Sequence, residues 1–199
     1  MRILVIGGAG TIGRRVVEYL TNDHELIVAG RSSGQVTVDL TSSDSIKKML
    51  DEVGNVDAIV CIAGEARWAE FKNLSEDDYY IGLRSKLMGQ VNLTRLGQEH
   101  LVEGGSITLS TGILADDPVI KTASAAMVNG AIHSFVKAAS LELERGIRLN
   151  AVSLGVVSDA YEKYKDYFPG HNPIPMNRVV NAYVKSILGK GNGLIIKDY

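Results

Sequence analysis

The sequence contains almost no cysteine and no excess of positive charge. Cys61 is the only cysteine among 199 residues, which excludes an internal disulfide framework and a cysteine-rich zinc cluster and fits a reducing compartment. The 21 lysines and arginines are outnumbered by 23 aspartates and glutamates, so no overall basic field attracts nucleic acid or an anionic membrane. We therefore expect a cytoplasmic protein that acts on a small molecule and holds no metal.

Long hydrophobic runs and prolines are also scarce. No apolar stretch approaches the roughly 20 residues needed to cross a bilayer, and the short run after Met1 leads into a glycine turn rather than a signal-peptide cleavage site. We expect no membrane-spanning or targeting segment. Three of the four prolines fall in residues 161–175, YEKYKDYFPGHNPIP, which break the periodic pattern of the chain. This segment is predicted to be a long loop or a short mobile helix over a site.

The chain does contain short apolar runs that alternate with longer segments of helical spacing. The runs are rich in Ile and Val at consecutive positions, which suits strands covered on both faces. They lie at residues 2–6, 25–29, 36–39, 57–62, 106–110, 147–153 and 193–197, and the helical segments at 11–22, 43–53, 75–103, 118–145 and 177–189. The alternation predicts an α/β fold with a Rossmann-like, doubly wound parallel sheet, and the length predicts a single domain over residues 1–199.

A glycine-rich segment, GGAGTIG, follows the first predicted strand and opens the first predicted helix. Gly7 would permit a tight turn, Gly10 would let backbone N–H groups approach a pyrophosphate, and Gly13 would let the helix pack closely on the strand. The helix N-terminus, with Thr11 and Ile12 in its first turn, would add partial positive charge. The context favours a dinucleotide site, and a plain glycine turn is the alternative.

The end of the second predicted strand bears on the choice of dinucleotide. The sequence AGRSSG offers no Asp or Glu to the ribose 2′-hydroxyl of NAD, and Arg31 and Ser32 stand there instead. A guanidinium group matches a 2′-phosphate, so we predict NADP(H), the alternative being a solvated loop arginine. Asp39, followed by Leu40, either accepts from the adenine amino group or merely ends a strand while a following serine caps the next helix.

Together these motifs resemble those of the short-chain dehydrogenase/reductase superfamily over nearly the whole chain. The segments that follow it in order are GGAGTIG, VDL, IAG, GGSITLST and RGIRLNAVSLG. The last is the most specific, since it follows RGIRVNAVAPG closely, with Leu154 where proline is usual. The glycine segment resembles the GxxGxxG variant of atypical members. The resemblance implies an oxidoreductase acting on a small carbonyl or alcohol, with Ala63 and Gly64 of IAG also at the cofactor.

The sequence departs from the superfamily at the residues that carry the chemistry. The resemblance implies a serine after the fifth strand, at Ser110 or Thr111, followed by a tyrosine and a lysine four residues apart on the next helix. Ala125, or Ser124 if the register slips by one, stands at the tyrosine, and Asn129 at the lysine. Alanine has no proton to donate, serine is too weak an acid, and asparagine has no charge with which to lower a pKa.

One further substitution, at Lys86, places a cation near the expected active site. Lys86, in SKLMGQVNLT, stands where the resemblance implies an asparagine, so Lys86 and Asn129 exchange the two residue types. Lys86 would then orient a substrate carbonyl or carboxylate, or donate a proton if burial lowers its pKa. An ordinary surface or interface lysine is the alternative. The expected catalytic set is thus Ser110, Thr111, Lys86 and Asn129.

Other side chains are weaker candidates. His133 is expected to point to solvent or to a subunit contact, and Cys61 to be a small buried hydrophobe rather than a nucleophile. Trp68 would wall the substrate pocket. A tyrosine of residues 161–175 would supply a phenol from above, although loop tyrosines more often pack than donate protons.

Two functions remain open at this point. One is an NADP(H)-dependent oxidoreductase with a rearranged site, and the other is a catalytically silent NADP(H)-binding sensor or scaffold that keeps the fold without the acid. The helix at 118–139 is apolar on almost all sides and needs cover beyond one sheet. The resemblance implies that it pairs with the 75–103 helix and their copies, so we expect a homodimer or homotetramer.

Overall fold

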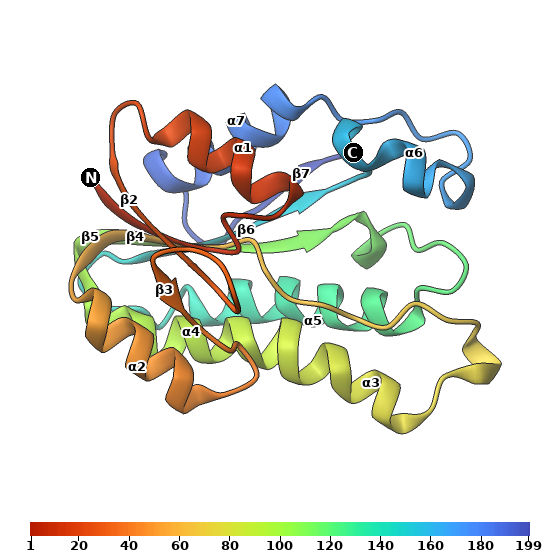
Figure 1. The fold of residues 1–199 in the computed structure, drawn as a ribbon, viewed down its shortest axis with the longest axis horizontal. Helices are drawn as coiled ribbons and strands as arrows, with labels where there is room; N and C mark the ends of the chain where they lie inside the picture. The colour runs from red at the N-terminus through yellow and green to blue at the C-terminus, as the bar shows by residue number, and fades with distance from the viewer.

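Seven strands form one sheet in the computed structural model, which describes all 199 residues (Figure 1). The order is β3-β2-β1-β4-β5-β6-β7, and every neighbouring pair is parallel. The strands are β1 (Arg2–Ile6), β2 (Glu25–Gly30), β3 (Val36–Thr37), β4 (Val56–Cys61), β5 (Leu101–Gly112), β6 (Arg148–Leu154) and β7 (Ile195–Asp198). The predicted doubly wound parallel sheet is confirmed.

Helices cover both faces of this sheet. On one face lie α1 (Thr11–Leu20) and α7 (Met176–Leu188), and on the other α2 (Ser43–Val53), α4 (Gly89–Gly97) and α5 (Ala123–Ala139) (Figure 1). The helix α3 (Glu76–Gly82) continues through a π-helical segment, η2 (Leu83–Met88), into α4. The short elements are η1 (Phe71–Asn73), η3 (Gln98–His100), η4 (Ile113–Ala115), η5 (Ser158–Ala160), α6 (Tyr161–Tyr164) and η6 (Lys165–Tyr167). None of the helices is both long and apolar enough to cross a membrane.

The helix expected at residues 118–145 is shorter at both ends. Lys121 has a φ of +68°, which an α-helix does not accommodate, and α5 therefore begins only at Ala123. At the other end the chain turns through Arg145 and Gly146, with φ of +54° and +68°, before it enters β6. The spacing of apolar side chains therefore stays helical beyond residue 139, although α5 ends there.

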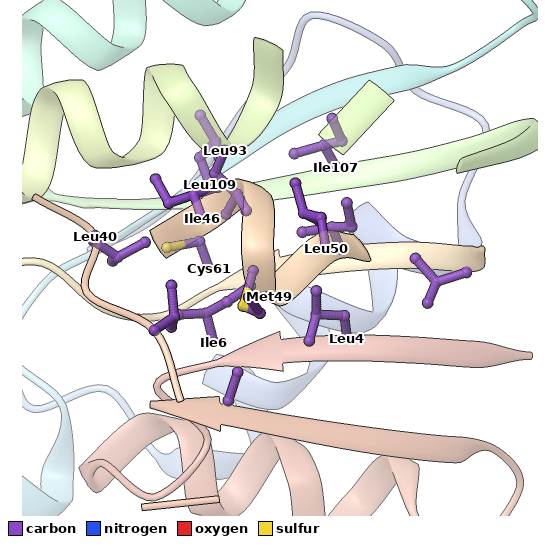
Figure 2. Packing of buried hydrophobic residues seen from close by; sticks show 14 of the residues in the cluster. Leu4, Ile6, Leu40, Ile46, Met49, Leu50, Cys61, Leu93, Ile107 and Leu109 are labelled. Atoms are coloured by element: carbon purple, nitrogen blue, oxygen red, sulfur yellow. The ribbon is translucent and has the colours of Figure 1, made fainter. Parts of the chain in front are cut away.

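The apolar residues form a separate layer on each face of the sheet. In α2, Ile46, Met49 and Leu50 follow the i, i+3, i+4 spacing of one helix face, and they point at Leu4 and Ile6 of β1 (Figure 2). Each such buried side chain contributes about 1.5–3 kcal/mol to stability. The packing fixes the strands, and with them the loops at their carboxyl ends.

Cys61 belongs to this layer. It is fully buried at the end of β4, and burial raises the pKa of its thiol to about 11. A thiol with that pKa is protonated at neutral pH, so the interpretation of Cys61 as a small hydrophobe rather than a nucleophile is confirmed.

Candidate functional site

The first βα turn forms a glycine cradle at the carboxyl end of β1. Gly7 has a φ of +83°, and a Cβ on Gly13 would lie 2.1 Å from the Gly7 carbonyl oxygen. Only glycine therefore lets α1 begin this close to the strand. Gly10, the N-cap of α1, offers no side-chain cap, and the first turn holds no acidic residue. The free N–H groups of this helix end fit an anion of phosphate size.

This cradle is one wall of a cleft of about 360 Å³. Of the residues assigned to the cofactor from the sequence, seven line it: Gly7, Gly10, Arg31, Ser32, Leu40, Ala63 and Gly64. Four do not, namely Thr11, Ile12, Gly13 and Asp39. The cleft runs across the ends of β1, β2 and β4, and its shape and donors fit a dinucleotide laid over the helix N-terminus.

Asp39 is engaged by its own turn. Its Oδ1 accepts hydrogen bonds from Thr41 N at 2.9 Å and from Thr41 Oγ1 at 2.8 Å. These bonds, with a smaller contribution from Arg31, lower the pKa of the Asp39 carboxyl. Ser42 caps α2 by accepting from Ser45 N at 3.2 Å, as the serine-cap interpretation expected.

A second pocket, of about 210 Å³ and mainly apolar, lies on the other side of the α1 start. Ile12 of α1, Gly112 at the end of β5 and Trp68 contribute to its wall. Residues 161–175 contribute Tyr164 of α6 and Phe168 to its wall, so the predicted short helix is confirmed, and its place over a functional site stays a prediction. Trp68 also lines this pocket, and its ring lies 5.6 Å from that of Tyr164 and 5.8 Å from that of Tyr167, so these tyrosines pack against it.

Neither Ser110 nor Thr111 lines the cleft or the apolar pocket. Ser110 Oγ donates to the Cys61 carbonyl at 2.5 Å and lies 2.7 Å from Tyr183 Oη, on the α7 face of the sheet. Thr111 Oγ1 lies 2.9 Å from His133 Nε2, on the α5 face. Both hydroxyls serve internal hydrogen bonds, and the β5 residue at the pocket is Gly112.

The expectation that His133 points to solvent or to a subunit is wrong. Only 8% of the residue is exposed, because its ring turns inward to meet Thr111. Burial lowers the pKa of His133, although the nearby Asp116 carboxylate raises it in part. A buried neutral imidazole bonded to a hydroxyl is a structural contact between α5 and β5.

Two buried side chains of α5 have unused hydrogen-bonding capacity. Ser124 and Asn129 are 0% and 4% exposed, and neither Ser124 Oγ nor Asn129 Oδ1 has a hydrogen-bond partner. A Cβ on Gly112 would lie 3.7 Å from Asn129 Nδ2, which places the amide directly behind the end of β5. An unpartnered buried polar atom costs about 1–3 kcal/mol, which makes both groups available to a water or a ligand.

Lys86 lies in the π-helical segment η2, a type of irregularity that often marks functional sites. It is half-buried and packs against Gly64, where a Cβ would lie 2.9 Å from the Lys86 Cα and 3.0 Å from its Cγ. Burial lowers the pKa of its ammonium, and the only group nearby that could offset this effect is Cys61, which is uncharged at neutral pH. Lys86 is therefore a cation behind the cleft without a carboxylate to neutralise it.

Two further polar residues near the cleft, Gln90 and Glu65, were not predicted from the sequence. Gln90, fully buried, donates to the Lys86 and Ser110 carbonyls at 3.1 Å each and accepts from Ser110 N at 2.8 Å, so it ties η2 to β5. Glu65 forms an ion pair with Arg31 at 3.2 Å at the mouth of the cleft. An uncharged polar residue four positions after Lys86 on a helix that faces a sheet was the available signal for Gln90.

Comparison with known proteins agrees with the fold. A family model described as Enoyl-(Acyl carrier protein) reductase matches residues 14–182. Versicolorin reductase 1 of Dothistroma septosporum is 28% identical over a match 165 residues long that covers 79% of this chain and 63% of that protein. NADPH-dependent aldehyde reductase 1, chloroplastic, of Arabidopsis thaliana is 27% identical over a match 156 residues long that covers 72% of this chain and 53% of that protein. The chain thus spans less than two thirds of the length of these curated relatives.

Solved structures match over a larger share of their chains. The protein lin1944 from Listeria innocua is 45% identical, with a TM-score of 0.98 and full coverage of both chains. A small-chain dehydrogenase solved in complex with NADPH is 25% identical, with a TM-score of 0.88 over 100% of this chain and 96% of that one. The family match over most of the sequence and the shared fold lead to one conclusion: the chain belongs to the short-chain dehydrogenase/reductase superfamily.

Proposed function

We propose that the protein is an NADP(H)-dependent oxidoreductase that acts on a small, largely apolar carbonyl or alcohol substrate through a rearranged active site. The observation that carries this proposal is the junction at the first turn of α1, where Gly10 lines the polar cleft and Ile12 lines the apolar pocket. A dinucleotide in the cleft would then end beside a pocket for an apolar substrate. The NADPH bound to one structural neighbour supports the same cofactor for this chain.

Different residues of the cleft would hold different parts of the cofactor. Gly10 and the open N–H groups of α1 would hold the pyrophosphate, and Arg31 with Ser32 would hold the 2′-phosphate. Ala63 and Gly64 would pass under the dinucleotide without side chains that block it. The bound nicotinamide supplies or accepts the hydride.

Lys86 and Asn129 line neither the cleft nor the apolar pocket, but each lies directly behind a glycine that does, Gly64 and Gly112. On that ground we assign them to the substrate oxygen. The Lys86 ammonium has no carboxylate partner, and the Asn129 amide lies behind Gly112 with an unused Oδ1, which would accept from the hydroxyl of an alcohol substrate. The Lys86 ammonium would orient the carbonyl and donate a proton to it, a task that a lowered pKa favours. Ser110 and Thr111 enter as positioning residues, because their hydroxyls hold the end of β5 in place.

The apolar pocket excludes water and selects the substrate. Trp68, Tyr164 and Phe168 cover strand ends that contribute only backbone and aliphatic groups, so the pocket favours a compact ring or chain over a sugar. The substrate is a small molecule, and the setting that suits a reduced Cys61 is the cytoplasm.

A silent NADP(H)-binding sensor is the second candidate, and one observation favours it. Along α5, Ser124, Ala125 and Asn129 face the interior without any phenol, and the hydroxyls of β5 are bonded internally. A protein built in this way keeps the cofactor cleft and lacks an evident strong acid apart from Lys86.

Turnover assays separate the two candidates. NADPH oxidation is followed by absorbance against a panel of apolar aldehydes, ketones and quinones, with wild-type protein, Lys86→Ala and the matched control Lys72→Ala, whose side chain is 79% exposed outside both pockets. We expect Lys86→Ala to lose about 10²–10⁴-fold in rate with NADPH affinity unchanged, and Lys72→Ala to keep both. NADPH binding without turnover on any substrate would support the sensor instead.

A further inference from the structure

Glu65 and Arg31 form an ion pair across the mouth of the cleft. Arg31 follows β2 and Glu65 follows β4, the two neighbours of β1 in the sheet, and 3.2 Å separates Arg31 Nη2 from Glu65 Oε1. Both side chains line the cleft, and no other charged side chain does. The Glu65 carboxylate is therefore paired with the Arg31 guanidinium, the only cation in the cleft that would favour a 2′-phosphate.

The backbone fixes the place of Glu65. Gly64, with a φ of +122°, passes so close to η2 that a Cβ would lie 2.9 Å from the Lys86 Cα. The next peptide is held by Ser85, whose buried Oγ accepts from Glu65 N at 3.2 Å. These two constraints fix the backbone of Glu65 at the cleft, within reach of Arg31.

The charges around Arg31 oppose an incoming phosphate. Glu65 pairs with the guanidinium directly, and Asp39 lies close enough for Arg31 to act on its ionisation. Two carboxylates beside one guanidinium leave a local charge of about −1 before any ligand arrives. A phosphate must displace Glu65 and meets both carboxylates, whereas a ribose 2′-hydroxyl meets no repulsion and can donate to the Glu65 carboxylate.

We propose that Glu65 sets the cofactor preference of the cleft by competing with the 2′-phosphate for Arg31, so that the protein binds NADH alongside NADPH. This inference rests on the proposed function, because it concerns the same dinucleotide site. The two side chains are 67% and 60% exposed, so solvent screens the pair and the effect of removing it is about two- to five-fold in affinity.

The test is the dissociation constant of NADPH and of NADH, measured by calorimetry at fixed ionic strength. The variants are Glu65→Gln, Arg31→Ala and the double variant, with Glu70→Gln as a control that removes the same charge outside the cleft, where Glu70 meets Lys72 at 3.4 Å. We expect Glu65→Gln to tighten NADPH two- to five-fold while NADH is unchanged or weakened. The control should leave the ratio of the two constants within about 1.5-fold.

The double variant shows whether the effect passes through Arg31. In the Arg31→Ala background, Glu65→Gln should no longer tighten NADPH by more than about 1.5-fold. An unchanged ratio in Glu65→Gln, or the same gain with and without Arg31, overturns the inference while dinucleotide binding by the wild type leaves the proposed function standing. A wild-type protein that binds neither dinucleotide overturns the proposed function itself, and this inference with it.

Discussion

Lys86 packs against Gly64 so closely that a Cβ on the glycine would lie 2.9 Å from the Lys86 Cα. The contact places a cation directly behind a residue that lines the dinucleotide cleft. No carboxylate offsets its burial, so the fold bears a cost at this point that a neutral side chain would avoid. A residue that costs stability and lies behind a cleft is a good candidate for function.

Lys86→Met is therefore expected to stabilise the protein and to abolish its activity. At pH 7 the free energy of unfolding should rise by about 1 kcal/mol, because Met fills the same space without a charge. Burial lowers the Lys86 pKa, so the unfolded chain binds the proton more tightly than the folded one. The gain of the variant should shrink as pH rises through the folded pKa toward the unfolded value of about 10.4.

Denaturant unfolding at several pH values, with Lys72→Met as the exposed control, measures this gain. A variant that is less stable than wild type at pH 7, or that keeps the wild-type rate, would contradict the role given to Lys86.

Ser110 and Tyr183 should behave as a structural pair. Tyr183→Phe is expected to cost about 1 kcal/mol, since it removes one partner of a buried 2.7 Å hydrogen bond, and Ser110→Ala about 2 kcal/mol, since it also removes the bond to the Cys61 carbonyl. The two losses should be less than additive in the double variant. Turnover and NADPH affinity should stay within about threefold of wild type, because the hydroxyl lies on the α7 face away from both pockets. A tenfold loss of rate in Ser110→Ala at unchanged stability would instead make Ser110 catalytic.

The exposed methionines on two adjoining helices carry the prediction of a homo-oligomer. Met88 at the end of η2 and Met127 on α5 are 44% and 42% exposed. The helices α4 and α5 lie on the same side of the sheet (Figure 1). We expect a mass of two or four times 21.5 kDa by light scattering, and a monomer for Met88→Glu combined with Met127→Glu. Leu188→Glu, at the end of α7 on the opposite face, should leave the assembly intact. A monomeric wild-type protein would remove the prediction.

The sequence predicted the strands well because their pattern reflects one strong physical cause. Consecutive Ile and Val residues favour a strand that is covered on both faces, and β1 was located to the residue. The same pattern could not show the start of α5, since the positive φ of Lys121 is a backbone property that its side chain does not announce. The glycine cradle was predictable because it is local to one turn.

Only those parts of the candidate site that are formed by residues close together in the sequence could be predicted. His133 follows Asn129 by four residues and so has the spacing of the buried face of α5, a signal that was available in the sequence. Its contact with Thr111, in contrast, depends on how α5 lies on β5, which no short stretch of sequence reveals. The same holds for Ser110. Successive side chains of a strand point to opposite faces of the sheet, so the face that Ser110 meets depends on the exact register of the last residues of β5. Glu65 and Arg31 are 34 residues apart and meet only through the strand order.

The most direct test of the account is NADPH binding by wild-type protein beside Gly10→Asp. Gly10 has extended backbone, with φ of −74° and ψ of 175°, and a Cβ there would meet only the Gly7 carbonyl oxygen at 3.4 Å. Aspartate is a favoured N-cap, so the variant should fold with unchanged or slightly higher stability. Its carboxylate would occupy the place proposed for the pyrophosphate, and we predict at least about a 100-fold loss of NADPH affinity relative to a wild type that binds in the micromolar range. Equal NADPH binding by the folded variant, or none by the wild type, would contradict the account.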